Sequence, residues 1–198
     1  PEFDAIIVRS ATKVRKEVID AAKNLKVIGR AGVGLDNVDR EAAEAKGIKV
    51  VNTPAATSAS VAELALAMIL ALTRPIVRGT LGLRQGLWEK KQLKATEVAG
   101  KTLGIIGLGR IGSRVATRMK AFEMRVIAYD PYVNVEKAEQ LGVPLVEYEQ
   151  LLRQSDIITI HAPLTDETFH MISHREINLM KDGAMLINAA RGSIVDHE

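Results

Sequence analysis

The stretch TLGIIGLGRIGSRVATRM, which begins at Thr102, constrains the fold more than any other part of the sequence. It places Gly107, Gly109 and Gly112 in the spacing GxGxxG between an aliphatic run typical of a buried strand and a helix-forming segment. In a dinucleotide-binding unit the first glycine permits a tight turn, the second lets the backbone approach a pyrophosphate, and the third lets helix and strand pack closely. The helix N-terminus then faces the phosphate charge.

The glycine spacing alone is a weak signal, because glycine turns are common. The next aliphatic run, RVIAYD, ends in Asp130, which lies 18 residues after Gly112 (130 − 112). An acidic residue about 20 residues beyond the glycines binds the ribose diol of a dinucleotide. A carboxylate there accepts hydrogen bonds from a free 2′-hydroxyl and repels a 2′-phosphate, so the sequence predicts NAD rather than NADP. The alternative is that Asp130 is a turn residue before Pro131.

Short aliphatic runs alternate with helix-forming segments along most of the chain, which predicts an α/β fold with a doubly wound parallel sheet. Helices are expected near residues 15–23 and 38–46. Strands are expected at residues 5–8, 26–28, 48–51, 102–107, 125–130, 144–147, 156–161 and 184–188.

The alternation pauses at NTPAATSAS, which begins at Asn52 and predicts a hinge. Ser60 is expected to cap a long apolar helix that starts near Val61. Its uninterrupted apolar core covers nine residues, 64–72, whereas a membrane span needs about 20, so a buried helix and no membrane partner are predicted. The opening PEFDAIIVRS has no basic leader and predicts a strand rather than a signal peptide.

Charge and cysteine usage narrow the classes of partner. The 198 residues carry a net charge of only +3, and the lysines and arginines are scattered, so no nucleic-acid partner is predicted. The densest basic cluster, WEKKQLK from Trp88, is interpreted as a solvated loop. The absence of cysteine excludes disulfides, thiolate catalysis and cysteine-ligated metal. We expect no metal site and a cytoplasmic location.

Several motifs together resemble the D-2-hydroxyacid dehydrogenase family, and within it the phosphoglycerate dehydrogenases. They are IVRSATKV, GRAGVGLDNVD, LGIIGLGRIGSRVA, VIAYDPY, HAPLTDET and LINAARGSIVD, in the family's order over essentially the whole chain. The resemblance implies that residues 1–54 are part of a smaller, flavodoxin-like substrate-binding domain. Residues 55–198 would be a Rossmann NAD-binding domain that is incomplete at its C-terminus. The implied reaction is NAD-dependent oxidation of the 2-hydroxyl of a phosphorylated 2-hydroxy acid, 3-phospho-D-glycerate.

Arg191 is the catalytic residue that the resemblance implies. Hydride transfer at C2 of a 2-hydroxy acid requires a fixed cation for the carboxylate and the developing oxyanion, and a guanidinium offers a bidentate fork. An arginine that only tethers its loop is the alternative. In the family, the strand end at His161, Ala162 and Pro163 lines the adenine and nicotinamide side. The full set implied for the cofactor is Gly107, Gly109, Arg110, Ile111, Gly112, Asp130, His161, Ala162, Pro163, Ala189, Ala190 and Arg191.

The substrate loops implied by the resemblance follow two strands near the start of the chain. Ligands of parallel sheets bind beyond the carboxyl ends of the strands, so the two loops are expected to face one cleft. Arginines there would meet a phosphate or a carboxylate, and solvated loop charge is the alternative reading. The residues are Arg9, Ser10, Arg30, Gly32, Val33 and Gly34.

None of the four histidines is assigned as the acid/base residue. In the family, that histidine and its carboxylate partner lie well after the arginine, so they are expected beyond Glu198, and the first strands of the substrate lobe before Pro1. The chain by itself is therefore expected to show little turnover. A dinucleotide-binding module without catalysis, like the corepressors that resemble this family, is the alternative function. A homodimer through the apolar helix Val61–Leu72 is expected.

Overall fold

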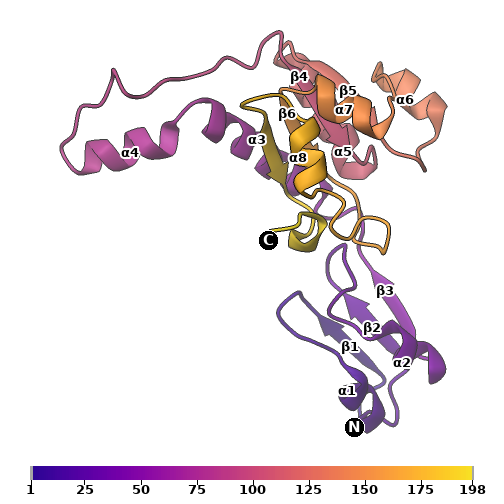
Figure 1. Cartoon of the computed structure of the whole chain (residues 1–198). Helices are drawn as coiled ribbons and strands as arrows, with labels where there is room; N and C mark the ends of the chain where they lie inside the picture. The colour runs from indigo at the N-terminus through magenta and orange to yellow at the C-terminus, as the bar shows by residue number, and fades with distance from the viewer. Residues whose placement is uncertain (1, 198) are drawn as a thin grey trace. The chain divides into compact units, whose positions relative to one another are not determined.

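The computed structural model describes residues 2–197 and divides the chain into two compact units between Ser58 and Ala59 (Figure 1). The division falls within the stretch NTPAATSAS. The predicted α/β fold, with parallel sheets flanked by helices, is confirmed.

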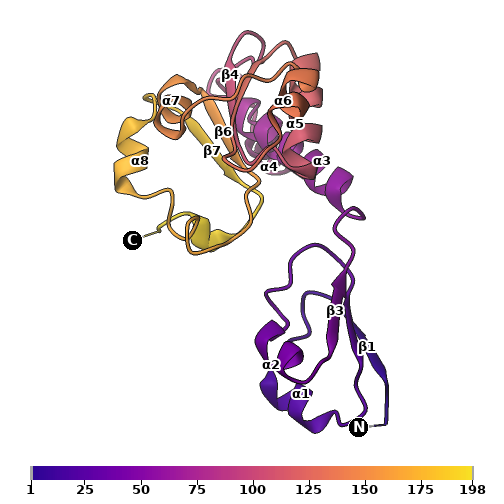
Figure 2. The same cartoon turned by 90° about the vertical axis from the view of Figure 1, so that its right-hand side faces the viewer.

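The first unit is a three-stranded parallel sheet in the order β1-β2-β3. Its strands alternate buried and exposed side chains: Val8 is buried against the helices, whereas Ile7 is 80% exposed on the opposite face. Both helices contribute to the same core, through Ile19 and Ala43, and lie on one side of the sheet (Figure 2). The elements are β1 (Ala5–Val8), α1 (Lys16–Ala21), β2 (Val27–Arg30), α2 (Arg40–Ala45) and β3 (Lys49–Asn52).

The second unit contains a four-stranded sheet, all parallel, in the order β5-β4-β6-β7. The helices before and after the glycine motif, α3, α5 and α6, lie on one side of it and α7 and α8 on the other (Figure 2). The elements are α3 (Ser58–Thr73), α4 (Ile76–Arg84), β4 (Thr102–Ile106), α5 (Arg110–Ala121), β5 (Arg125–Tyr129), α6 (Val135–Leu141), α7 (Tyr148–Gln154), β6 (Ile157–Ile160), α8 (His174–Leu179), β7 (Met185–Asn188) and the 3₁₀ turn η1 (Gly192–Ile194).

Strand β4 shows why the sheet is buried on both faces. All five of its residues are buried. Ile105 packs into the core beneath α3 and α5, and its neighbour Ile106 packs into the core beneath α7. Successive side chains of a strand point to opposite faces, so an unbroken aliphatic run is what a sheet between two helical layers requires.

Three predicted details are wrong. The apolar helix α3 is buried on one face only, because Leu64 and Leu72 are 56% and 57% exposed. Residues 144–147 form no strand: Leu145 makes one isolated parallel bridge to Ala128, because Pro144 has no N–H to donate and α7 begins at Tyr148. Ser60 is not the cap of the apolar helix, because α3 already begins at Ser58, so Ser60 lies within its first turn.

Within residues 2–197, no single helix is long and apolar enough to span a membrane. Only α3 and α4 taken together reach the necessary length and composition, and their axes are bent by 67°.

Candidate functional site

The carboxyl ends of the four strands in the second unit form one edge of the sheet. Ile106 at the end of β4 pairs with Tyr129 and Ile160, and Ile160 pairs with Asn188. The backbone therefore leaves all four strands at the same level, which is where ligands of doubly wound sheets bind. The residues that follow the strand ends are Gly107, Asp130, His161 and Ala189.

The three glycines of the motif occupy different environments. Gly107 has a φ of +93°, and a Cβ there would lie 2.8 Å from the backbone N of Ala162, so the loop crosses the end of β6 closely. At Gly112 a Cβ would collide with the carbonyl of Gly107, which is why α5 can begin so near β4. At Gly109 a Cβ would meet no described atom within 4 Å, so the space above this residue is open.

The N-terminus of α5 points its first amides at that open space. Gly109 is the N-cap of α5, and Ser113 is the first residue of the helix whose N–H donates to the Gly109 carbonyl. The N–H groups of Arg110, Ile111 and Gly112 precede the first bond of the helix ladder. Three amides and a positive helix end are the usual protein contribution to a pyrophosphate site.

Asp130 joins the end of β5 to the glycine loop. One carboxylate oxygen, Oδ2, accepts a hydrogen bond from the N–H of Leu108 at 2.8 Å, and the other, Oδ1, accepts from the N–H of Tyr132 at 3.0 Å. Each carboxylate oxygen can accept more than one hydrogen bond, so both keep acceptor capacity for a ribose hydroxyl. The carboxylate thus has a structural role, and its binding of a ribose stays a prediction.

The loops after β5 and β6 are also linked to each other, through Tyr132 and Glu167. The hydroxyl of Tyr132 donates to Oε2 of Glu167 at 2.5 Å, and this bond raises the pKa of Tyr132. Thr168 folds the same loop back, since its hydroxyl donates to the carbonyl of Pro163 at 2.6 Å. The bond between Tyr132 and Glu167 connects the segment that carries Asp130 with the segment that carries Ala162 and Pro163.

His161 is a buried, neutral imidazole. Burial lowers its pKa from 6.5 to about 4, so it carries no charge near neutral pH. Its Nε2 lies 3.0 Å from the hydroxyl of Thr159, and Nδ1 has no hydrogen-bond partner among residues 2–197. A group with so low a pKa is poorly matched to proton transfer at neutral pH.

Arg191 lies on a short turn after β7. Asn188, the last residue of the strand, donates from Nδ2 to the Arg191 carbonyl at 2.7 Å and accepts at Oδ1 from the Ala190 N–H at 3.0 Å. The guanidinium Nη1 donates to the Ala190 carbonyl at 3.0 Å. Between the strand end and the arginine, Ala189 and Ala190 carry only methyl side chains.

The segment after Arg191 pairs with the end of the loop that follows β6. His170 N–H donates to Ser193 O at 2.9 Å, Ile172 N–H to Ile194 O at 3.1 Å, and Asp196 N–H to Ile172 O at 2.8 Å. These bonds make residues 170–172 a support for residues 193–196.

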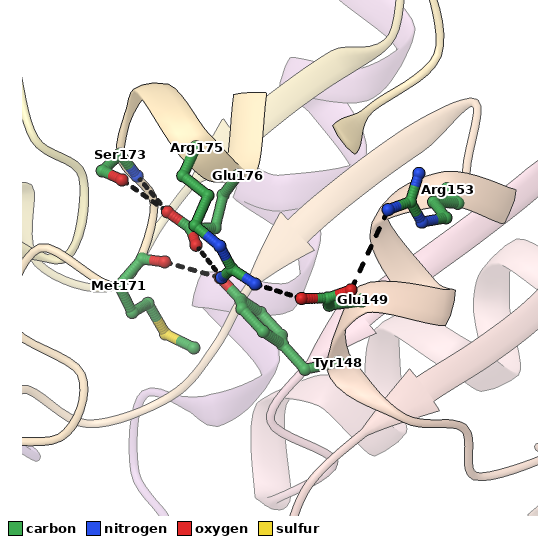
Figure 3. Close-up of polar contacts among 7 residues, drawn as sticks. All are labelled: Tyr148, Glu149, Arg153, Met171, Ser173, Arg175 and Glu176. Atoms are coloured by element: carbon green, nitrogen blue, oxygen red, sulfur yellow. Dashed lines mark hydrogen bonds and ion pairs between the residues drawn. The ribbon is translucent and has the colours of Figure 1, made fainter. Parts of the chain in front are cut away.

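A polar cluster between α7 and α8 fixes residues 170–172 (Figure 3). Tyr148 donates its hydroxyl to the carbonyl of Met171 at 2.6 Å, and burial raises the pKa of Tyr148. Glu176 accepts at Oε2 from the hydroxyl and the N–H of Ser173, at 2.5 and 3.0 Å, and at Oε1 from Arg175 at 2.8 Å. Arg175 also pairs with Glu149. Burial alone would raise the pKa of Glu176, but the hydrogen bonds from Ser173 and Arg175 outweigh it and lower that pKa.

The predicted substrate residues of the first unit gather beyond the ends of β1 and β2. Arg30 donates to the hydroxyl of Ser10 at 2.9 Å and to the carbonyl of Ala31 at 3.2 Å. Its Nε is buried, and no partner for it lies within residues 2–197. The guanidinium of Arg30 lies in the space that a side chain at residue 32 would need, and this residue is Gly32, with a φ of +143°. Arg9 and Val33 are exposed, and Gly34 continues the loop that begins at Ala31. A cation, a hydroxyl and a glycine-rich backbone can together bind an anion.

Sequence reasoning missed the polar residues that hold these loops. Thr53 accepts from the Gly32 N–H at 2.8 Å, and Asn52 donates to the Val33 carbonyl at 2.6 Å. In the second unit, Ser113 donates to the Gly109 carbonyl at 2.7 Å, and Asn188 brackets the arginine turn. A polar residue directly at a strand end or a helix start was the available signal.

Among residues 2–197, no group of three or more histidine, aspartate or glutamate side chains is arranged to hold a metal ion.

Residues 66–198 match the family model of the D-isomer specific 2-hydroxyacid dehydrogenases, in its NAD-binding domain. The chain therefore belongs to this family, and the predictions of the family and of NAD as its cofactor are confirmed. It is 54% identical over 196 residues to a D-3-phosphoglycerate dehydrogenase of Archaeoglobus fulgidus, and 52% identical over 198 residues to a hydroxypyruvate reductase of Thermotoga maritima. The alignments cover 99% and 100% of this chain, but the chain spans only 37% and 64% of the two relatives.

A solved structure shows the same fold. D-lactate dehydrogenase from Aquifex aeolicus, complexed with NAD and lactic acid, superposes with a TM-score of 0.89 at 39% identity, over 98% of this chain and 59% of the other. The glycine loop fits a dinucleotide on the geometry of this chain alone, because the amides at the start of α5 and the open space at Gly109 lie at one sheet edge with Asp130.

Proposed function

We propose that the encoded protein is an NAD-dependent dehydrogenase that oxidises the 2-hydroxyl of a phosphorylated 2-hydroxy acid, 3-phospho-D-glycerate, to 3-phosphohydroxypyruvate. The observation that carries the proposal is the position of Arg191, on a turn fixed by Asn188 at the same sheet edge as the glycine loop and Asp130. A nicotinamide cofactor supplies the hydride acceptor for such a reaction.

The roles of the residues follow from their chemistry. The amides at the start of α5 would bind the pyrophosphate of the cofactor, and Asp130 would accept hydrogen bonds from the ribose hydroxyls. Arg191 binds the substrate carboxylate and stabilises the charge on the C2 oxygen as its proton leaves. In this reaction the C2–H bond would break with its electron pair, which a bound nicotinamide would accept as hydride. The hydroxyl proton would pass to a general base outside the set of residues assigned here, and the C2–O bond would become a carbonyl. The neutral, buried His161 lines the cofactor side and does not accept the proton.

A preference for a phosphorylated acid is proposed from an anion-binding loop within the first unit. Arg9 and Arg30, with Ser10 and the loop from Gly32 to Gly34, are proposed to bind the phosphate or carboxylate of the substrate. The relatives named for phosphoglycerate and for hydroxypyruvate have almost equal identity to this chain, so identity does not separate these substrates. The arginine pair favours the phosphorylated acid.

The test is to supply 3-phospho-D-glycerate, D-glycerate and D-lactate to the encoded protein with NAD and follow NADH formation. We expect the highest kcat/KM with the phosphorylated acid and a loss of about 10²–10³-fold in Arg191→Ala. Arg153→Ala is the matched control, because this arginine lies on α7 with a 58% exposed side chain and should keep full activity. Binding of NADH without turnover of any of the three acids would instead favour the non-catalytic module.

We also propose that two copies of the chain associate through α3. Leu64, Met68 and Leu72 recur every four residues along one face of α3 and are 56%, 37% and 57% exposed. Ile76, Val77 and Leu81 on α4 are more than half exposed as well. A contiguous apolar face of this kind marks an association surface, and an isologous contact of like faces is the commonest protein assembly.

A cytoplasmic location stays a prediction.

A further inference from the structure

Asn188 uses both halves of its side-chain amide on the turn that carries Arg191. Nδ2 donates to the Arg191 carbonyl at 2.7 Å while Oδ1 accepts from the Ala190 N–H at 3.0 Å. The two bonds span three residues of backbone from the last residue of a strand. Strand β7 is itself fixed by its pairing with β6, since Asn188 pairs with Ile160. The amide therefore transfers the rigidity of the sheet to the turn.

The guanidinium of Arg191 is linked to the same two hydrogen bonds of Asn188. Arg191 donates from Nη1 to the carbonyl of Ala190, the residue whose N–H Asn188 accepts. The carbonyl of Arg191 accepts a second bond, from the Ile194 N–H at 3.1 Å, at the start of the 3₁₀ turn η1. Displacement of the Asn188 side chain would thus release the backbone on both sides of the arginine.

We propose that Asn188 is a positioning residue for Arg191: it sets the place of the guanidinium relative to the reacting carbon and does not itself touch the substrate. The inference rests on the proposed function, in which Arg191 acts on a 2-hydroxy acid. A charged group that stabilises a developing oxyanion must be held close to its productive position, and a displacement of about 1 Å can cost about 10²-fold in rate.

Few side chains can replace Asn188, because both a donor and an acceptor are needed at this position. Aspartate has the shape of asparagine but no donor, so it keeps the acceptor for Ala190 N–H and places a negative oxygen against the Arg191 carbonyl. Alanine lacks both groups. Glutamine has the same amide on a chain longer by one methylene, which moves both atoms away from the turn.

The experiment compares Asn188→Ala and Asn188→Asp with the unmodified encoded protein, with NAD and 3-phospho-D-glycerate. We expect kcat/KM to fall by about 10²-fold in both variants, with a much smaller change in NADH affinity. Amide hydrogen exchange of the peptide covering residues 189–194 should become faster. Asn134→Ala is the matched control: it removes the N-cap bond to Glu136 N–H on α6, at 2.8 Å, and should lower stability without changing kcat/KM.

A double-mutant cycle separates positioning from a general structural effect. If Asn188 acts through Arg191, then Asn188→Asp should cause almost no further loss in kcat/KM when Arg191 is already alanine. A full additional loss in that background would overturn the inference, and so would unchanged activity or unchanged exchange in the two Asn188 single variants. Should Asn188→Ala fail to fold, Asn188→Asp, which retains one of the two bonds, gives the same comparison.

The cycle also distinguishes this inference from the proposed function. If Arg191→Ala keeps full activity, the role of Arg191 fails and the positioning role of Asn188 fails with it. If Arg191→Ala loses activity but the Asn188 variants do not, only the positioning role fails.

Discussion

Asp130 and Leu108 are joined by a hydrogen bond of 2.8 Å, in which the carboxylate at the end of β5 accepts the N–H of the glycine loop after β4. The residue proposed to select the cofactor therefore also holds the loop proposed to bind its pyrophosphate. Any substitution at Asp130 changes two properties, and the two must be measured separately.

Replacement of Asp130 should weaken the preference for NADH over NADPH. Asp130→Asn removes the charge that repels a 2′-phosphate but retains an oxygen acceptor for one backbone N–H. Asp130→Ala leaves the N–H groups of Leu108 and Tyr132 without this acceptor and should lower the free energy of unfolding by about 1–3 kcal/mol. Binding titrations with both cofactors and chemical denaturation measure the two effects. Equal affinity of the unmodified protein for NADH and NADPH would contradict the ribose assignment.

The glycines offer a matched pair of substitutions. In Gly109→Ala the new methyl group meets no described atom, so the protein should keep its stability, but the methyl would occupy the space proposed for the pyrophosphate and NADH affinity should fall. In Gly112→Ala the methyl collides with the Gly107 carbonyl, so stability itself should fall by about 1–3 kcal/mol. Thermal unfolding together with NADH titration distinguishes them. Unaltered NADH affinity in Gly109→Ala would place the pyrophosphate elsewhere.

His161 should make the protein less stable in mild acid. Its pKa falls from 6.5 when unfolded to about 4 when folded, because burial disfavours the charged ring. Between these values the unfolded chain binds the extra proton, so stability is lost as the pH falls from about 6.5 to about 4, by at most about 3 kcal/mol.

Denaturation curves across this range for the unmodified protein and His161→Gln measure the contribution of the ring. The variant should show a shallower loss of stability between these pH values. In the same variant the pH dependence of kcat should keep its midpoints, since His161 is not the proton acceptor. A lost limb in the pH profile would identify His161 as the base instead.

The cluster of Figure 3 should stabilise the support beneath the arginine turn. Tyr148→Phe leaves the carbonyl of Met171 without its hydroxyl partner and should cost about 1 kcal/mol. Glu176→Gln removes a carboxylate whose pKa is lowered in the folded state, so its stabilisation is present above the unfolded pKa of 4.5 and is lost as the pH falls below it. Unfolding curves near neutral pH and in acid measure both. Equal stability of Glu176→Gln and the unmodified protein near neutral pH would show that the cluster contributes nothing.

Met68→Glu should separate the two copies of the chain. A carboxylate in the middle of the exposed face of α3 would lose its hydration in the contact between copies, and two such charges would face each other near a two-fold axis. We expect sedimentation to give a dimeric mass for the unmodified protein at micromolar concentration and a monomeric mass for Met68→Glu. Glu63→Gln on the same helix is the control. A monomeric unmodified protein would contradict the assembly, and a requirement for detergent would point to the bent pair α3 and α4 as a membrane-associated segment.

The sequence predicted the strands of both sheets from their aliphatic runs, but such a run does not show whether both faces of the strand are covered. All of TLGII in β4 is buried, whereas Ile7 in the run AIIV of β1 is 80% exposed. The prediction was wrong at residues 144–147, where an apolar run beside Pro144 forms only one bridge, because the pairing depends on the neighbouring edge and not on apolar content. The choice of Asp130 came from its spacing to the glycines.

The hydrogen bonds that orient the candidate residues could not be predicted in the same way. Asn188 is visible in LINAARG as a polar residue at a strand end, but only the path of the turn brings its amide to Arg191. Likewise, the guanidinium of Arg30 lies in the space that a Cβ at Gly32 would fill, and the sequence does not specify the side chain's direction.

The central claim is direct hydride transfer from C2 of the hydroxy acid to NAD. It is tested most directly by supplying the encoded protein with NAD and 3-phospho-D-glycerate that carries deuterium at C2, and then locating the label. We predict that the deuterium appears on the nicotinamide ring of the NADH formed and that NADH and 3-phosphohydroxypyruvate accumulate in equal amounts. Deuterium released to water, or no NADH formation from this acid while NADH still binds, would contradict it.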